Sequence, residues 1–285
     1  MRISIGLPSA VSPPTGTIVV DWAREAEALG FSSLSVIDRV LADTYDPLTV
    51  LAAAAAVTTR VELMTAVVLA PLRPAAILAT QAATVDQISA GRLTLGLGVG
   101  SREEDYVAAD ADYRRRGRTL DVQIKQMRAA WRGSGEFAVG PRPYRAGGPP
   151  LLFGGYSEAT VRRVTEVGEG WICARGGAAA FSPMAERICK DWAVAGREGR
   201  PRLMSVVNYS LGQDADAVRD TFMRAYYGTK PFVQDMIDET PTTIDGLHAV
   251  LNEHDAAGCD GVVLLPCAPA LGQLELLAGS FTQLQ

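Results

Sequence analysis

The sequence QISAGRLTLGLGVG, residues 87–100, contains the strongest fold signal of the chain. Gly91 can adopt the left-handed conformation that ends a helix, so the helical pattern that begins at Ala75 is expected to stop there. Residues 93–97 then alternate as a short, mostly apolar strand. The stretch therefore predicts a helix, a strand and a glycine-rich loop in direct succession.

Glycine recurs with period two at Gly96, Gly98 and Gly100, across the strand end and the loop. One face of this segment lacks side chains, which would let a flat ligand or a phosphate contact the backbone. The alternative is that the glycines only relieve crowding in a tight barrel core or a turn. The stretch alone leaves both interpretations open, because a single glycine-rich loop is a weak motif.

Apolar segments typical of strands alternate with helical segments almost from end to end of the chain. We expect strands at residues 2–7, 33–37, 61–67, 93–97, 151–153, 171–174, 203–209 and 261–265. We expect helices at residues 18–29, 47–58, 75–88, 113–131, 158–167, 183–195, 215–226 and 243–257. A strand followed by a helix, repeated over roughly 250 residues, predicts a (β/α)8 TIM barrel, here as a single domain over residues 1–285. An open doubly wound sheet is the second choice.

Residues 136–150 interrupt this rhythm with four prolines. Such a composition breaks regular elements, so we expect an excursion, in the form of a hairpin, over one mouth of the barrel. Its side chains, together with those of residues 8–15, 41–46 and 226–232, are candidates to line a substrate pocket. Their aromatic residues and prolines favour an apolar or aromatic compound.

The net charge of -5 and the pI near 5.2 argue against a nucleic-acid or membrane partner, since both call for a clustered positive field. The one basic cluster, residues 114–118, is short, and its arginines are expected on a solvated face, although one of them could reach an anion. The chain shows no long apolar run and no signal-peptide pattern. We therefore expect a soluble, cytoplasmic protein.

The four cysteines lack C-x-x-C spacing and the chain has only two histidines, so no metal site of the usual zinc kind is expected. The cysteines stand in apolar surroundings such as WICA and LLPCA. This pattern favours free, buried thiols in a reducing compartment.

In a TIM barrel the functional site lies at the carboxyl ends of the strands. Asp38 and Arg39 follow the second expected strand, and the turn Gly154-Gly155-Tyr156-Ser157 follows the fifth and opens a helix. This turn offers free backbone N–H groups, a hydroxyl and a favourable helix dipole, which together can hold a phosphate. A capped helix after a tight turn is the plain alternative.

No nucleophile and base stand together in the pattern. His248 and His254 both fall in the last long helix and are expected at the surface, and the three lysines do not follow strands. Covalent hydrolysis is thus poorly supported, and a phosphate-binding isomerase or aldolase ranks last. A glycine-lined face beside a phosphate site fits an enzyme whose cofactor carries the difficult chemistry.

The chain resembles the bacterial luciferase-like flavin and deazaflavin oxidoreductases. The resemblance is most specific over residues 61–131, from VELMTAVVLAPLRPAAILATQAATVDQISAGRLTLGLGVGSREEDY onward to RRRGRTLDVQIKQMRAAW. Supporting segments are AREAEALGFSSLSVIDR, PPLLFGGYSEATVRRVTEVGEGWI and TTIDGLHAVLNEHDAAGCDGVVLL, in the family's order.

The resemblance implies FMN or the deazaflavin coenzyme F420, bound at the carboxyl ends of the strands. It also implies a bulge after the third strand, frequently with a non-proline cis peptide, that supports the back of the ring. The implied cofactor-binding residues are Thr65, Ala66 and Val67 at the bulge, Gly98, Val99 and Gly100 at the floor, Asp38 near the ring, and Gly154, Gly155, Tyr156 and Ser157 at the phosphate.

Two departures from the family leave the cofactor undecided. Arg39 stands where many deazaflavin-dependent members have a histidine after the aspartate. It could stabilise an anionic reduced ring, pair with a substrate carboxylate or be a structural partner of Asp38, so Asp38 and Arg39 are the candidate catalytic residues. Val99 stands near the position where luciferases acting on long-chain aldehydes carry a phosphate-gripping arginine. Of the acidic residues 103–105, at least two are expected in a solvated turn, and one could face the pocket.

The leading hypothesis is a luciferase-like oxidoreductase that uses reduced FMN or F420 on a small organic substrate. With FMN the reaction would be a monooxygenation, and with F420 a hydride transfer. The resemblance further implies a homodimer and a flavin or F420 reductase as partner. The alternative from another class is a non-catalytic barrel that keeps the pocket for ligand binding.

Overall fold

The computed structural model describes residues 1–10, 16–134, 140–228 and 230–281. Its strands form one parallel sheet in the order β3-β2-β1-β9-β8-β7-β6-β5-β4, and β3 also pairs with β5, which closes the sheet into a barrel. The strands are β1 (Arg2–Gly6), β2 (Ser33–Val36), β3 (Glu62–Thr65), β4 (Val68–Leu69), β5 (Leu93–Gly98), β6 (Leu151–Gly154), β7 (Gly170–Cys173), β8 (Arg202–Tyr209) and β9 (Gly261–Pro266). The predicted TIM barrel is confirmed, and the open sheet is excluded by this closure.

The third strand of the barrel is divided in two. The peptide bond between Ala66 and Val67 is cis, and it separates β3 from β4. Both pieces pair with β5, with Leu63 opposite Leu93 and Val68 opposite Leu97. They therefore serve as one strand of an eight-stranded barrel, as the single predicted strand at residues 61–67 requires.

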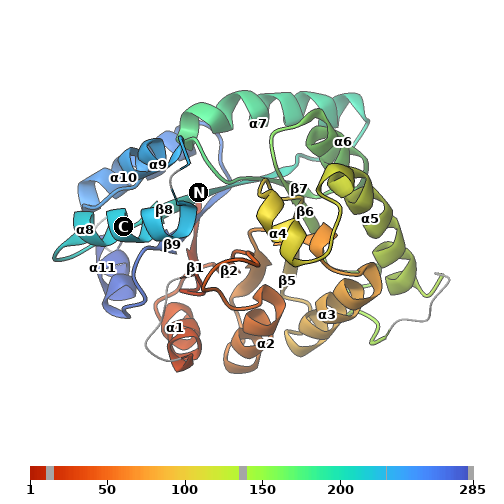
Figure 1. The fold of residues 1–285 in the computed structure, drawn as a ribbon, viewed down its shortest axis with the longest axis horizontal. Coiled ribbons are helices and arrows are strands. Elements are labelled where there is room, and N and C mark those ends of the chain that lie inside the picture. The colour runs from red at the N-terminus through yellow and green to blue at the C-terminus, as the bar shows by residue number, and fades with distance from the viewer. Residues whose placement is uncertain (11–15, 135–139, 229, 282–285) are drawn as a thin grey trace.

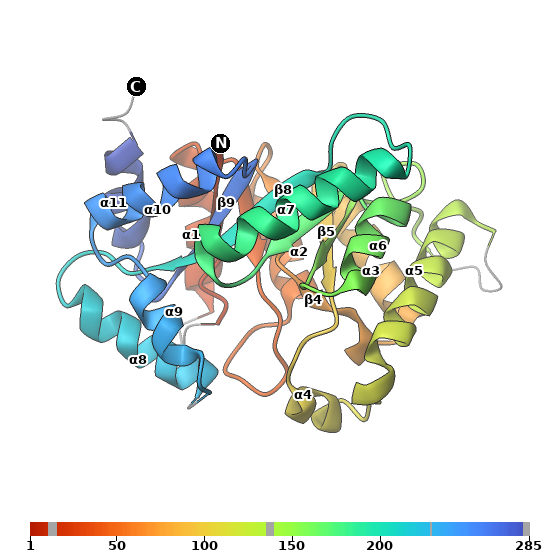
Figure 2. The same ribbon diagram turned by 90° about the horizontal axis from the view of Figure 1, so that it is seen from above.

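Helices surround the barrel, as Figures 1 and 2 show. They are α1 (Thr17–Ala28), α2 (Pro47–Val57), α3 (Ala75–Ile88), α4 (Glu103–Ala108), α5 (Arg116–Arg132), α6 (Glu158–Val167), α7 (Gly177–Val194), α8 (Ala215–Tyr227), α9 (Val233–Glu239), α10 (Ile244–Ala256) and α11 (Gly272–Phe281), with short 3-10 turns η1 (Ala70–Leu72) and η2 (Tyr113–Arg115). Several begin at side-chain caps: Asp46 accepts the N–H of Thr49, and Thr243 accepts that of Gly246.

The main difference from the predicted helices is at α7. Pro183 suggested a helix start, but the helix begins at Gly177 and the proline lies inside it. A proline favours the first turn, yet here the alanine-rich segment before it extends the helix. The short helices α4, α9 and α11 were not predicted.

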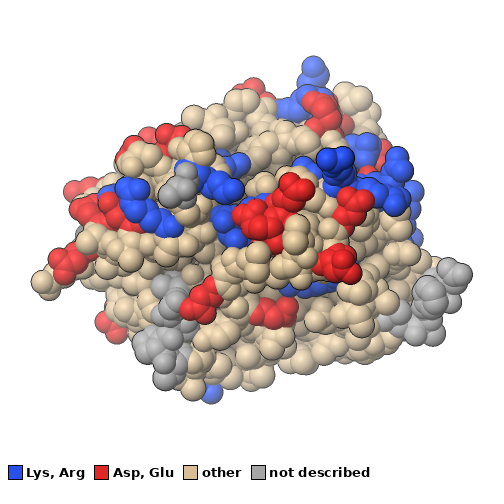
Figure 3. All heavy atoms as spheres, in the orientation of Figure 1, with Lys and Arg blue, Asp and Glu red and all other residues tan. Residues whose placement is uncertain are grey.

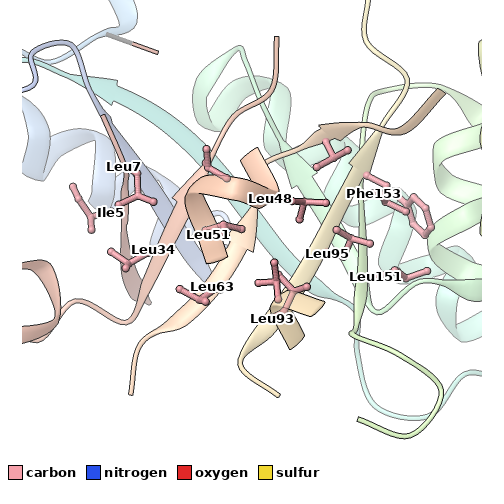
Figure 4. Packing of buried hydrophobic residues seen from close by; sticks show 14 of the residues in the cluster. Ile5, Leu7, Leu34, Leu48, Leu51, Leu63, Leu93, Leu95, Leu151 and Phe153 are labelled. Atoms are coloured by element: carbon pink, nitrogen blue, oxygen red, sulfur yellow. The ribbon is translucent and has the colours of Figure 1, made fainter. Parts of the chain in front are cut away.

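Side chains of the strands alternate between two apolar layers. Ile172 packs inside the barrel with Met64, Leu152 and Met204. Its neighbour Trp171 belongs to the larger layer between strands and helices. Figure 4 shows part of that outer layer, including Leu34, Leu63 and Leu93 from the strands and Leu48 and Leu51 from α2. Both faces of the strands are thus buried, as expected for a parallel sheet covered by helices.

The described part of the predicted 136–150 excursion, residues 140–150, lies at the amino ends of the strands. Residues 136–139 are outside the described part of the chain, and residues 140–150 contain no strand, so a hairpin is not formed by the described portion. The Arg145 N–H donates to Asp86, and the Gln87 amide donates to the Arg142 carbonyl. Arg145 and Pro150 line a hollow at the amino mouth, together with Arg2 and Arg202. For residues 140–150 the prediction that they line the substrate pocket is wrong, because helix-to-strand connections return to the end of the barrel opposite the site.

On the face drawn in Figure 3, acidic and basic side chains are interspersed. Within the described ranges, none of the helices is both long and apolar enough to cross a membrane.

Candidate functional site

A cavity of about 420 Å³ lies at the carboxyl ends of the strands. Its floor is the upper end of the barrel interior, where Ile172, Val206 and Leu265 meet the Ala66–Val67 peptide. Of the residues proposed from the sequence for the site, those that line it are Asp38, Arg39, Ala66, Val67, Gly98, Val99, Gly100, Gly154, Gly155, Tyr156 and Ser157. Loops far apart in the sequence thus meet around one space.

Among the residues proposed for cofactor binding or catalysis, Thr65 alone does not line the cavity. Its side chain is fully buried, and its hydroxyl donates to the Gly96 carbonyl at 2.7 Å. It supports the floor from behind by tying β3 to β5.

The glycines of β5 make room for the barrel's own atoms. A Cβ at Gly96 would lie 2.0 Å from the Thr65 carbonyl oxygen, and one at Gly98 would lie 2.6 Å from Val67 Cγ2. Relief of crowding is therefore the correct explanation for Gly96. At Gly98 the missing side chain admits Val67, which then forms part of the floor.

The turn at residues 154–157 places a helix N-terminus at the cavity. Gly155 has φ +123°, a conformation that favours glycine, and a Cβ there would lie 2.8 Å from the Thr160 hydroxyl oxygen. Ser157 caps α6 by accepting the Thr160 N–H. The first N–H groups of a helix lack intrahelical acceptors, so this end of the cavity presents donors and a positive dipole.

Tyr156 ties the same turn to the loop after β7. Its hydroxyl accepts the N–H groups of Ala174 and Arg175 at 3.0 and 2.8 Å and donates to the Arg175 carbonyl. Burial raises the pKa of this hydroxyl, and Cys173 beside it adds to the effect. The phenol is therefore neutral and acts as a fixed link.

Asp38 is fully engaged by neighbours other than Arg39. Arg73 donates to both of its carboxylate oxygens, at 2.6 and 3.0 Å, and the Leu69 N–H donates at 2.8 Å. Burial lowers the pKa of Arg73, but the hydrogen bonds and charges of Asp38 and Asp46 outweigh it and raise that pKa. The idea that Arg39 is the structural partner of Asp38 is wrong, because the turn η1 brings Arg73 to it instead.

Arg39 pairs with the buried acid of α4. Its Nε lies 3.0 Å from Asp105 Oδ2, and both side chains are less than a tenth exposed. Asp105 also accepts the Leu41 N–H. Of the acidic residues 103–105, Asp105 alone is buried and reaches the cavity, whereas Glu103 is exposed. The pair joins the loops that follow β2 and β5.

Three arginines of the lining were not singled out from the sequence: Arg102, Arg116 and Arg175. Within the described residues, none of them lies within ion-pair distance of a carboxylate. Burial, followed by the charge of Arg39, lowers the pKa of Arg102. Among the described residues, the lining therefore carries three arginines that form no ion pair with an acid. The arginine cluster at residues 114–118 was the available signal for Arg116, and Arg102 follows the glycine-rich loop directly.

Tyr226, Tyr227 and Phe232 form an aromatic wall of the cavity. Arg102 lies over the rings of Tyr226 and Tyr227, with its guanidinium carbon 5.6 and 5.4 Å from their centroids. Of residues 226–232, which were expected to line a pocket, these three aromatic residues do so, and residue 229 lies outside the described part of the chain.

His254 was expected at the surface, but the structure places it in the interior. It is fully buried, its Nε2 lies 3.0 Å from the Ser205 hydroxyl, and its Nδ1 lies 2.8 Å from the Val250 carbonyl oxygen. The periodicity of α10 allowed either face, and packing against β8 decided it. All four cysteines are free thiols, and within the described residues no group of three acidic, histidine or cysteine side chains is placed to hold a metal.

Comparison with known sequences gives a family and uncharacterised relatives. The family described as luciferase-like monooxygenase matches residues 1–260. A relative from Mycobacterium tuberculosis, described as an uncharacterised protein, is 31% identical over 175 residues, which are 57% of this chain and 61% of the relative. The match thus spans about three fifths of that relative's length.

Comparison with solved structures gives close likeness in fold. A monooxygenase, RslO1, from Streptomyces bottropensis has a TM-score of 0.80 at 20% identity, with 99% of both chains covered. An F420-dependent secondary alcohol dehydrogenase, in complex with an F420-acetone adduct, has a TM-score of 0.78 at 18% identity over all of both chains. The oxygenating constituent of a Pseudomonas putida 3,6-diketocamphane monooxygenase, in complex with FMN, has a TM-score of 0.72 at 15% identity, covering 98% of this chain and 97% of that one.

These structural likenesses establish the fold, and the family match extends over most of the chain. The divided third strand, the cis peptide and the cavity at the carboxyl ends of the strands agree with the resemblance seen in the sequence. The chain belongs to the luciferase-like monooxygenase family.

Proposed function

We propose that the chain binds reduced FMN or coenzyme F420 in the 420 Å³ cavity and uses it to oxidise or reduce a small organic substrate. The observation that carries the proposal is the charge of the lining: Arg102, Arg116 and Arg175 surround a cavity that ends at the N-terminus of α6. Both cofactors carry phosphate, and such a surface favours an anion. Structural neighbours described with FMN and with F420 support the choice of these two.

The residues present fit such a group. The Nε of Arg116 is buried without a hydrogen-bond partner in the described structure, while its Nη1 donates to the Tyr113 carbonyl. An unsatisfied buried donor in a cavity wall costs free energy unless a ligand accepts from it. Arg102 is held over Tyr226 without an ion pair among the described residues, and a bound anion would offset the cost of its desolvation.

In this proposal the turn Gly154, Gly155, Tyr156 and Ser157 holds the phosphate. Ala66 and Val67, with Thr65 behind them, support the ring, and residues 98–100 form the floor beside it. A bound flavin or deazaflavin would supply the redox chemistry, and the protein supplies position, shielding and charge.

Of the two candidate catalytic residues, Arg39 has its charged group at the cavity, because Asp105 and the Leu41 carbonyl hold the guanidinium there. Asp38 faces the cavity but receives three hydrogen bonds from Leu69 and Arg73. We assign Asp38 to positioning the loops rather than to proton transfer. Arg39 would stabilise negative charge on the ring or on a substrate.

The proposal includes a single domain over residues 1–285 that forms a homodimer and acts with a flavin or F420 reductase. The substrate is proposed to be apolar or aromatic, because Tyr226, Tyr227 and Phe232 line the cavity. Four free thiols are typical of a reducing compartment and support the cytoplasm as its location.

Titration of the purified apoprotein with FMN and with F420, each oxidised and reduced, tests the proposal through cofactor fluorescence. FMN binding with oxygen uptake supports monooxygenation, and preference for F420 supports hydride transfer. If neither cofactor binds with micromolar or tighter affinity, the proposal is wrong.

The matched variants are Arg116→Gln and Arg118→Gln, on the same helix. Arg116 lines the cavity and Arg118 is exposed outside it. We expect the first change to weaken cofactor binding by about tenfold, the order of one charge-assisted hydrogen bond, and the second to leave it unchanged. Equal effects would show that Arg116 does not contact the cofactor.

A further inference from the structure

A second hollow, of about 500 Å³, lies beside the cofactor cavity. It is bounded by Leu41 after β2, by Val218 and Phe222 on α8, and by Cys267 after β9. Among the described residues, Tyr226 lines both spaces. The hollow therefore shares a wall with the cofactor cavity, but it has no part in that cavity's floor.

The ring of Tyr226 is the partition between the two spaces. Phe222 stacks on it from the side of the hollow, with centroids 5.7 Å apart and planes at 16°. The guanidinium carbons of Arg39 and Arg102 lie over the ring, 5.3 and 5.6 Å from its centroid, and both arginines line the cofactor cavity. The tyrosine therefore has an apolar neighbour facing the hollow and cationic neighbours facing the cavity.

The lining of the hollow is almost wholly apolar. Its polar members are Asp43 and Thr221, and the Thr221 hydroxyl already donates to the Ala217 carbonyl at 2.8 Å. Burial raises the pKa of the Cys267 thiol to about 12, so this group is neutral. No cation belongs to the lining among the described residues, in contrast to the arginine-rich cavity across Tyr226.

Apolar side chains also remain exposed at the edge of the hollow. Leu41 is 51% exposed and the adjacent Val40 is 38% exposed. Exposed apolar surface beside a concave site favours the binding of an apolar molecule.

We propose that this hollow binds the apolar, uncharged part of the substrate, with Tyr226 between it and the redox cofactor. The proposal rests on the proposed function for the identity of the bound molecule as substrate. A volume of about 500 Å³ falls in the range of small-molecule sites. Since the described lining offers no cation, a carboxylate in this part of the substrate is disfavoured.

Nile red, an uncharged apolar dye, is the probe for the hollow, and 1-octanol and octanoate are the competitors. We expect the dye to bind the apoprotein and to be displaced at least about tenfold more effectively by 1-octanol than by octanoate, because the hollow cannot compensate the carboxylate. If octanoate displaces the dye as effectively as 1-octanol does at the same concentration, the proposal is wrong.

Ala225→Arg places a cation in the lining at an exposed helical position, so folding should not be affected. Ala193→Arg makes the same change on an exposed position of α7, outside the hollow. In the first variant the affinity for octanoate relative to 1-octanol should rise by about tenfold, and in the second it should stay at the wild-type value. An unchanged ratio in Ala225→Arg would show that the ligands bind elsewhere.

Cofactor titration of the same proteins separates this proposal from the proposed function. Both variants should bind FMN or F420 as the wild type does, and dye binding should persist in the cofactor-loaded protein. Competition between dye and cofactor would place the dye in the cofactor cavity and overturn the proposal. Absence of cofactor binding with intact dye binding would instead overturn the proposed function alone.

Discussion

At the scale of single residues, the site depends on side chains whose partners come from other loops. Asp38 and Arg39 are adjacent in sequence, yet Asp38 pairs with Arg73 and Arg39 pairs with Asp105. These two pairs neutralise both aspartates of the lining. Arg102, Arg116 and Arg175 are thereby left as the charges that an anionic ligand would meet.

Gly98→Ala tests the steric role of the glycine-rich strand end. Its Cβ would lie 2.6 Å from Val67 Cγ2, so the valine would have to move into the floor. We expect cofactor binding, measured by fluorescence titration, to weaken by about tenfold, with a loss of about 1 kcal/mol in the free energy of unfolding. The control is Gly272→Ala, where an added Cβ meets no atom within 4 Å. Wild-type cofactor affinity in Gly98→Ala would contradict the assignment of this floor.

Asp105→Asn tests the buried pair with Arg39. The change leaves the Arg39 guanidinium, whose side chain is 8% exposed, without its carboxylate. We expect the free energy of unfolding in urea at pH 7 to fall by about 2 to 3 kcal/mol. Glu103→Gln, at an exposed position of the same helix, should change it by less than about 0.5 kcal/mol. If both variants unfold alike, the pair does not stabilise the fold.

At the scale of elements, local sequence signals marked most boundaries, and packing decided the exceptions. The caps at Asp46, Ser157 and Thr243 begin α2, α6 and α10 as their sequences suggest. The start of α7 and the short helix α4 carry no comparable signal. Helix α4 is fixed instead by burial of Asp105 and by Tyr106, whose hydroxyl donates to the Val99 carbonyl.

One connection between elements depends on pH. The Glu27 carboxylate of α1 accepts the N–H groups of Thr59, Arg60 and Val61, which lead into β3. Burial raises the pKa of this carboxyl, but the three donors and the Arg60 charge outweigh it and lower the pKa from 4.5 to about 2. A depressed pKa means that the stabilisation is complete above pH 4.5 and is lost as the pH falls through about 2.

Glu27→Gln should therefore lower the free energy of unfolding by about 1 kcal/mol at pH 7, a value discounted for solvent screening of this half-buried group. The difference from the wild type should shrink toward pH 3, as urea unfolding at both pH values can show. Glu25→Gln on the same helix is the control and should have little effect at either pH. A difference that does not depend on pH would mean that the carboxylate charge is not responsible.

At the scale of the whole molecule, closure of the barrel brings together strands that are distant in sequence. Arg202 of β8 donates to both oxygens of Glu62 at the start of β3, with Nη2 at 2.8 Å from Oε2. The Thr94 hydroxyl of β5 donates to the same carboxylate. Burial raises the pKa of Glu62, but Arg202 outweighs it and lowers that pKa below its ordinary value. This cluster joins three strands at the amino mouth.

Glu62→Gln should lower the free energy of unfolding by about 2 kcal/mol at pH 7, because it leaves Arg202 without a carboxylate. The loss should become smaller at acid pH, because the unfolded chain takes up the Glu62 proton as the pH falls below 4.5, while the folded carboxylate does so only at lower pH. Arg202→Gln combined with Glu62→Gln should cost less than the sum of the single changes in urea unfolding. Strict additivity would show that the two residues do not interact.

The sequence by itself determined the order of the barrel strands and of the main helices between them, because hydrophobic periodicity, caps and glycines act within a few residues of one another. It also determined which strand ends carry the candidate site, since the carboxyl ends of parallel strands meet at one mouth of the barrel. Only the tertiary structure decided that Asp38 binds Arg73, that Asp105 binds Arg39 and that His254 is buried. It likewise placed the 140–150 segment at the far mouth and Arg102, Arg116 and Arg175 at the cavity. These outcomes depend on distances between loops of different strands, which are set by closure and twist of the whole barrel and leave no periodic signal in the chain.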